Sequence, residues 1–168
     1  MISFKGLFLI FLGIVILWIA GCHQQELPVE PPAKKEGKYS NSDTCTFTLD
    51  FYRNHMEEWP AMHNGGDSMK IGCYWYHKDQ LLQILNNTAL DNGLIILAHQ
   101  WIPARLNIFK GVWAPQEVLD AINGGHEIIG CRLIPPFGNN YRSPNEVKSA
   151  ASILEDYNIG IIGPGYCK

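Results

Sequence analysis

The chain has 168 residues, 46% of them hydrophobic, and carries 16 acidic against 13 basic side chains. Its closest approach to a basic cluster is Lys34-Lys35, which has Glu30 and Glu36 nearby. Because nucleic acid binding requires clustered Lys and Arg, this composition argues against nucleic acid as a partner.

The first 21 residues are typical of a secretory signal peptide. Lys5 is their only charge, and the uncharged run from Gly6 to Gly21 reads GLFLIFLGIVILWIAG. A short positive start, an apolar stretch and small residues before a cleavage site define such signals. Two alternatives stay open: an uncleaved N-terminal membrane helix, for which about 20 apolar residues are needed, and secretion without an anchor.

The end of this run, Ile19-Ala20-Gly21-Cys22, resembles the bacterial lipobox. In that motif an aliphatic residue, two small residues and a cysteine are recognised by a lipid transferase and a dedicated peptidase. The resemblance implies lipid attachment at Cys22, with acyl chains such as palmitate on the mature N-terminus. Several chains hold a protein stably to a bilayer, whereas one holds it only marginally. The residue after Cys22 is His23, where an aspartate often retains such proteins at the inner membrane, so the outer membrane is favoured.

Residues 22–43 are predicted to form the lipidated N-terminus and a disordered tether. The segment is polar, mixed in charge and interrupted by three prolines, which favour extended backbone. Cleavage before Cys22 removes Lys5 and leaves 12 basic against 16 acidic residues, a slightly acidic mature chain. Residues 44–168 then form a single domain, which is long enough to build its own core.

The hydrophobic pattern of residues 44–168 predicts a mainly α fold: a small helical bundle with loops and at most a short β element. Met69–Tyr76 is the best candidate for the extended segment, since it is rich in aromatics. The expected helices span Leu49–Glu58, Lys78–Leu85, Ala89–Phe109, Pro115 to Gly124-Gly125, and Pro144–Tyr157.

Local signals set the ends of these helices. Thr48 is expected to cap the first helix, and Trp59-Pro60 to end it. Ser143 and Glu146 have the spacing of a capping box at the last helix. The section LIILAH of the longest helix is apolar nearly all round, which predicts a central, buried helix, and Pro103 predicts a kink in it.

Once Cys22 is set aside, the chain has an even number of cysteines: Cys45, Cys73, Cys131 and Cys167. Exported cysteines usually pair, and four of them allow three connectivities that spacing alone does not distinguish. A bridge from Cys45 to Cys167 would clamp the two ends of the domain and leave Cys73 with Cys131. Each bridge would contribute on the order of 2–4 kcal/mol, mainly by restricting the unfolded chain. A four-cysteine zinc site would require close C-x-x-C pairs, which the sequence lacks.

Histidines are the candidates for chemistry, because the common catalytic motifs are missing from the sequence and no catalytic residue is assigned. His55 and His99 lie on apolar helix faces, where a histidine can be a metal ligand or a general base. Asp50 or Glu57 would complete a metal site with them. The alternative is that each histidine makes one structural hydrogen bond. The other histidines of the domain are expected near loops, in solvent.

Five aromatic residues are candidates for a binding surface, because aromatic side chains are enriched at interfaces. The alternative is that most of them belong to the hydrophobic core. They are Trp59, Tyr74, Trp75, Tyr76 and Trp113.

The segment CTFTLDFYRNH, from Cys45 to His55 and followed by Trp59-Pro60, resembles the signature of an uncharacterised group of exported bacterial proteins. That signature runs C-T-x-T, usually Gln-Gly, an aromatic pair, Lys, Asn or Thr, His, and then W-P. The later segments LLQILNN, GLIILAHQWIPARLN and GPGYC resemble the same group. This chain differs at four positions of the signature, where it has Leu49, Asp50, Tyr52 and Arg53 for Gln, Gly, Trp and Lys. The resemblance implies a domain and an exported location rather than a reaction.

These patterns favour a cell-envelope lipoprotein whose domain binds or scaffolds an envelope protein or polysaccharide without catalysis. The lipid on Cys22 would attach the protein to the membrane, and no other cofactor is expected. The alternative function is a metal-binding protein or a hydrolase that uses His55 and His99.

Overall fold

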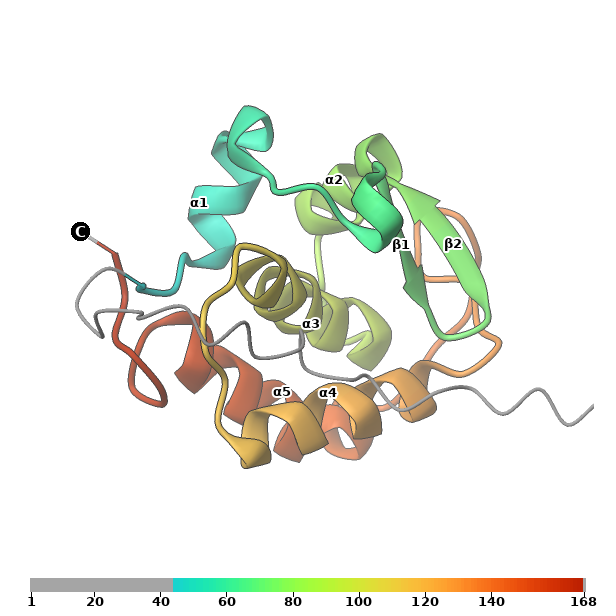
Figure 1. The fold of residues 1–168 in the computed structure, drawn as a ribbon. Coiled ribbons are helices and arrows are strands. Elements are labelled where there is room, and N and C mark those ends of the chain that lie inside the picture. Colours follow the sequence, from blue (N-terminus) through green and yellow to red (C-terminus); the bar gives the residue numbers. More distant parts are fainter. Residues whose placement is uncertain (1–43, 168) are drawn as a thin grey trace, which may run out of the picture. The chain divides into compact units, whose positions relative to one another are not determined.

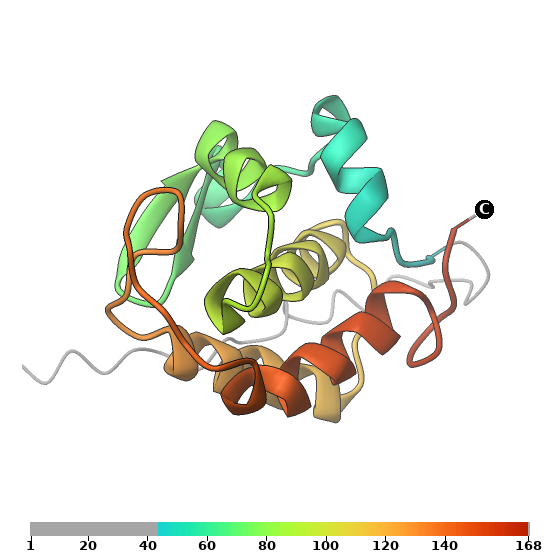
Figure 2. The ribbon, with the colours of Figure 1, turned by 180° about the vertical axis from the view of Figure 1, so that it is seen from behind.

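Helix α3 (Gly93–Phe109) forms the centre of the fold in the computed structural model, which describes residues 44–167. The predicted signal peptide, lipidated Cys22 and tether lie outside the described residues. Figures 1 and 2 show α3 between two groups of helices. On one side of α3 lie α4 (Gln116–Ile129) and α5 (Pro144–Asn158), and on the other lie α1 (Leu49–Asn54) and α2 (Lys78–Asn86).

The β element is a two-stranded antiparallel hairpin of β1 (Ser68–Ile71) and β2 (Tyr74–His77). Two disulfides join Cys45 to Cys167 and Cys73 to Cys131, with Cα–Cα distances of 5.0 and 4.7 Å. The predicted fold class is therefore confirmed: a mainly α bundle with a short β element, stapled by two disulfides.

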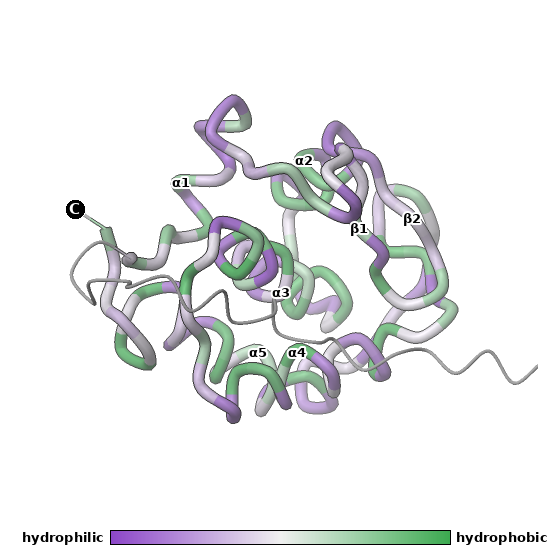
Figure 3. Tube along the Cα trace, in the orientation of Figure 1, coloured by the Kyte–Doolittle hydropathy of each residue, from purple (hydrophilic) through white to green (hydrophobic). Residues whose placement is uncertain are grey.

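The central helix is buried on almost every side, as its apolar sequence predicts, and Figure 3 shows hydrophobic stretches along it that alternate with polar residues. It begins at Gly93 rather than at the expected Ala89. Leu90 has a left-handed φ of 45°, which interrupts a helix. The Asn92 side chain then caps α3, accepting a hydrogen bond from the Leu94 N–H at 3.0 Å. The helix continues through Pro103 to Phe109.

Helix α1 begins after Thr48, as predicted, but it ends at Asn54 instead of Glu58. In a longer helix the Tyr52 carbonyl would accept from the backbone N–H four residues on. The indole N–H of Trp59 takes this acceptor instead, at 2.9 Å. The chain therefore turns at His55 and folds Trp59 into the core.

Helix α4 passes through Gly124-Gly125, where it was expected to end, and reaches Ile129. A Cβ at Gly125 would lie only 2.9 Å from the Trp101 ring of α3. The glycine thus allows α3 and α4 to approach closely, and the helix ends instead at Gly130, which has a positive φ of 52°.

The extended segment Met69–Tyr76 is not one strand but a hairpin that turns at Gly72-Cys73. Gly72 has a φ of 58°, and a Cβ there would meet the Gly130 carbonyl. The Cys73 N–H donates to the same carbonyl at 3.1 Å. The hairpin turn is therefore fixed to the end of α4 by a disulfide, a hydrogen bond and a close backbone contact.

Two terminal segments pair at the opposite side of the domain. The Thr46 N–H donates to the Gly165 carbonyl, and the Cys167 N–H donates to the Thr46 carbonyl, both at 2.8 Å. This short parallel bridge lies beside the Cys45–Cys167 disulfide. The beginning and the end of the domain are therefore held together by both covalent and hydrogen bonds.

Asn107 of α3 connects this pairing to the core, and it is fully buried. Its Oδ1 accepts from the Phe47 N–H at 2.8 Å and from the Tyr52 hydroxyl at 2.9 Å. Its Nδ2 donates to the Phe47 carbonyl at 2.9 Å and to the Asn158 Oδ1 at 3.3 Å. One amide side chain thus joins the N-terminal segment, α1, α3 and α5.

We predict that Asn107→Ala lowers the free energy of unfolding by about 3 kcal/mol or more. The substitution leaves several buried polar groups unpaired, and each such group costs about 1–3 kcal/mol. Denaturant unfolding under non-reducing conditions measures the change. Asn123, exposed on α4, provides the control: Asn123→Ala should change the free energy by less than about 0.5 kcal/mol. Equal effects of the two substitutions would contradict the role of Asn107.

Candidate functional site

His99 is buried in α3, and both of its ring nitrogens have partners. Its Nε2 lies 3.1 Å from the Ile84 carbonyl, to which it donates, and its Nδ1 lies 3.5 Å from Nη2 of Arg53. This pair of partners fits the neutral imidazole with the proton on Nε2. Burial lowers the pKa of His99, and the positive charge of Arg53 lowers it further. His99 therefore acts as a neutral link between α1, α2 and α3.

A shallow pocket of about 410 Å³ opens beside His99. Arg53 is the cation of this pocket, and its guanidinium is already engaged on three sides. Nε donates to the Leu85 carbonyl at 2.6 Å, Nη1 lies 3.6 Å from Asp50, and Nη2 faces His99. The pocket therefore offers little free charge for a ligand. Its lining consists of Arg53, Asn86, Asn87, Thr88, Ala89 and His99.

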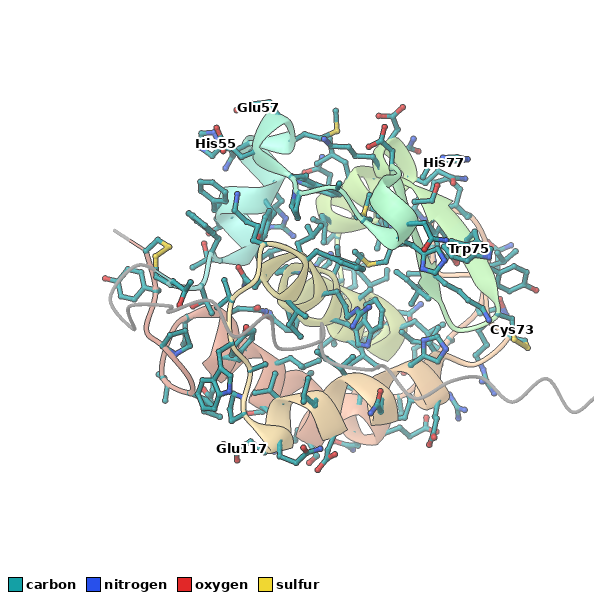
Figure 4. All side chains as sticks on the ribbon, in the orientation of Figure 1. His55, Glu57, Cys73, Trp75, His77 and Glu117 are labelled. Atoms are coloured by element: carbon teal, nitrogen blue, oxygen red, sulfur yellow. A yellow bond between two sulfur atoms is a disulfide. The ribbon has the colours of Figure 1, made fainter. Side chains whose placement is uncertain are left out.

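His55 lies at the turn after α1 and is half-exposed. Its Nδ1 is 3.2 Å from Glu57, and its ring packs on Phe51 with a centroid distance of 4.8 Å. Figure 4 shows His55 and Glu57 next to each other at the outer end of this segment. The hydrogen bond to His55 contributes to the lowered pKa of Glu57, after the backbone hydrogen bond of Glu57 itself.

The structure does not bring His55 and His99 together into one site. Each has its own partners, Glu57 for His55, and Ile84 with Arg53 for His99. Across residues 44–167, no group of three His, Cys, Asp or Glu side chains is arranged to hold a metal ion.

The five candidate aromatic residues separate into core and surface. Trp59 and Tyr76 are 6% and 2% exposed and belong to the core. The Tyr76 hydroxyl accepts from the Ile134 N–H at 3.1 Å, and burial raises the pKa of Tyr76. Tyr74, Trp75 and Trp113 are exposed. Tyr74 and Trp75 are neighbours on β2, while Trp113 lies in the segment between α3 and α4.

The outer surface of the hairpin collects an aromatic ring and several polar side chains. Trp75 is 50% exposed and pairs across the strands with Lys70, while His77 pairs with Ser68. The Ser68 hydroxyl lies 2.9 Å from Nδ1 of His77. His63, from the preceding turn, packs on Trp75 with a centroid distance of 4.9 Å. We call these five residues the hairpin face; Figure 4 shows Trp75 and His77 along β2.

The alternation of side chains along a strand explains why the hairpin face is separate from the core. Trp75 and His77 point to one side of the hairpin, and Tyr76 to the other. Met69 and Ile71 of β1 are buried on the Tyr76 side. The core side therefore fixes the hairpin rigidly, and the outer side is left to present Trp75 with polar neighbours.

Sequence reasoning missed four of these five residues, although a signal exists for Ser68, Lys70 and His77. Period-two alternation in YWYH places Trp75 and His77 on one side, and a turn at Gly72 would pair them with Lys70 and Ser68. His63 also went unrecognised. It reaches Trp75 through a turn with a left-handed Asn64, φ 53°, which the sequence pattern does not reveal.

Most residues of the segment Cys45–Trp59, which carries the family resemblance, have structural roles. Thr48 caps α1, accepting from the Phe51 N–H at 3.3 Å. Tyr52 and Trp59 are core residues, and Arg53 binds the end of α2. The segment therefore specifies how the N-terminal part packs, rather than a reactive centre.

No protein-family model matches this chain, and no curated protein sequence or solved structure is significantly similar to it. Within the part that the structure describes, no helix is both long and apolar enough to cross a membrane.

We predict that His99 makes the domain less stable in mild acid. Since its pKa is lower in the folded than in the unfolded state, its contribution is complete above the unfolded value of about 6.5 and is lost as the pH falls through the folded value. Denaturant unfolding between about pH 7.5 and pH 5 measures this loss. His99→Gln should flatten the pH dependence, and Asn123→Ala, which changes an exposed non-titrating residue of α4, should not. An unchanged slope in His99→Gln would exclude this role.

Proposed function

We propose that this protein is an exported lipoprotein of the cell envelope whose domain binds polysaccharide, without catalysis, through the hairpin face. The observation that carries the proposal is the exposed ring of Trp75, which lies between His63 and polar side chains of β1 and β2. The lipid on Cys22 would hold the domain at the membrane, and the outer membrane is favoured.

The disulfides support an exported location. Both bridges join residues far apart in sequence, by 122 and 58 positions. Such bridges persist in oxidising compartments and are rare in the reducing cytosol. They also fit the interpretation of Cys22 as a lipid site, because the remaining cysteines are then all paired.

A binding role agrees better with the described side chains than a catalytic role does. The buried His99 has partners on both nitrogens, and His55 is engaged with Glu57. A general base must reach the proton that it removes, and a metal-bound histidine must offer a free nitrogen. The two histidines lie apart, and neither is positioned to act with the other as a general base or as a metal ligand.

The chemistry of the hairpin face favours a polysaccharide over a protein. A stable protein interface needs about 800 Å² on each partner, with an apolar centre. The aliphatic residues of the hairpin instead lie on its buried side. One exposed indole ring that is flanked by polar side chains can stack on the flat apolar face of a sugar.

We predict that Trp75→Ala weakens binding to insoluble peptidoglycan by at least about tenfold, as expected for a central aromatic contact. The measurement is the fraction of detergent-solubilised mature protein that sediments with peptidoglycan sacculi, with soluble N-acetylglucosamine oligomers as competitors. Trp113→Ala, which removes an exposed tryptophan outside the hairpin face, is the matched control. Wild-type protein that stays in solution, or equal binding by Trp75→Ala, would end the proposal.

We predict that the mature protein begins at Cys22 and carries acyl chains there. Mass spectrometry of the N-terminal peptide should find the added lipid mass, and Cys22→Ala should abolish that lipid. Full-length protein with an unmodified Cys22 would disprove the anchor, whatever the hairpin face binds.

A further inference from the structure

A second exposed apolar surface lies around the C-terminal loop, away from the hairpin. Trp113 and Ile161 are 63% and 69% exposed, Tyr166 is 53% exposed, and Ile159 is also exposed. We call these four residues the C-terminal patch. Figure 3 shows hydrophobic residues in the loop after α5. Figures 1 and 2 both show this loop on the opposite side of the domain from β1 and β2.

Direct contacts hold the two segments of the patch together. The Tyr157 hydroxyl donates to the Trp113 carbonyl at 3.3 Å. Gly163 packs closely against the Tyr157 ring, and a Cβ there would lie 3.8 Å from Pro115. The Ile161 N–H donates to the Asp156 carbonyl at 2.8 Å. The exposed side chains are therefore presented on an ordered backbone and not on a loose tail.

The patch lies beside the first described residues of the domain. Tyr166 bridges to Thr46, and the adjacent Cys167 is bonded to Cys45. The residue before Cys45 is the first that the structure describes. The chain that leads to Cys22 thus leaves the domain beside the patch.

The composition of the patch suits the interfacial zone of a bilayer. Trp and Tyr have an apolar ring and a polar edge, and both are enriched at the boundary between lipid tails and water. Ile159 and Ile161 add aliphatic surface. Lys110, which is three positions before Trp113, is already engaged, because its ammonium donates to the Glu58 carbonyl and lies over the Phe47 ring. Contact should therefore depend on apolar burial more than on anionic headgroups.

We propose that the C-terminal patch rests on the same bilayer that holds the lipid of Cys22, so that Trp113 enters its interface. This inference depends on the lipid anchor of the proposed function. Cys22 and Cys45 are only 23 positions apart in sequence, so a lipid on Cys22 would keep the patch close to the bilayer. Attachment through one site raises the effective concentration of a second site on the same surface, so docking of the patch needs less affinity than binding from solution.

The test uses lipidated, mature protein in phosphatidylcholine vesicles that contain acyl-brominated lipid, which quenches tryptophan within the bilayer. Trp59 and Trp101 are buried, so Trp75 and Trp113 are the exposed tryptophans of the described domain. Quenching should occur in wild type, persist in Trp75→Phe and disappear in Trp113→Phe. Ile161→Ser, which keeps both fluorophores, should reduce it. Circular dichroism verifies that each variant is folded.

The outcomes separate this inference from the anchor. Protein that floats with the vesicles without quenching retains the anchor and overturns the docking. Quenching that survives in Trp113→Phe also overturns it. If Trp113 is shielded from soluble acrylamide but is not quenched by brominated lipid, a second copy of the protein covers the patch, and the proposal is wrong. Protein that does not float would overturn both the anchor and the docking.

Discussion

The joining of the chain ends is the constraint on which the rest of the structure depends. Cys45 and Cys167 are bonded, and Thr46 pairs with the backbone on both sides of Tyr166. Directly after this clamp, Asn107 fixes Phe47 and so sets where α1 begins over α3. Without that position Tyr52 would not reach Asn107, and Trp59 would not fold beneath α1. The clamp thus determines the packing of the N-terminal part, and also the surface beside Trp113.

The fold was predictable where local chemistry agrees with tertiary packing. The capping box at Ser143, the cap at Thr48 and the apolar run of α3 all act locally and are all present. The predictions failed where a tertiary contact sets the end of a helix. Gly125 continues a helix because Trp101 needs the space, and α1 ends early because the Trp59 indole takes a backbone acceptor. Trp101 is remote from Gly125 in sequence, and Trp59, although only seven positions from Tyr52, shows nothing in the sequence pattern that predicts its bond to that carbonyl.

The candidate site was predictable in its residue types but not in its grouping. The exposed Trp75 was among the aromatic candidates, and the sequence could not separate it from the buried Tyr76 until the turn at Gly72 fixed the register. His63 joins it only through a left-handed turn residue. His99 illustrates the opposite case: a histidine on an apolar helix face has a neutral, structural role because Ile84 and Arg53 occupy both nitrogens.

The two disulfides also determine how the domain would carry mechanical load. The first, Cys45–Cys167, lies at the N-terminal edge of the described domain, and the second, Cys73–Cys131, joins the hairpin turn beside Trp75 to the end of α4. If the membrane anchor held one end of the domain and a polymer were bound at the hairpin, the pulling force would act on the domain at the two disulfides. At the membrane end it would be shared between α1 and α5, and at the polymer end between β2 and α4. Neither terminus nor hairpin could peel away alone, so the domain would resist as one unit.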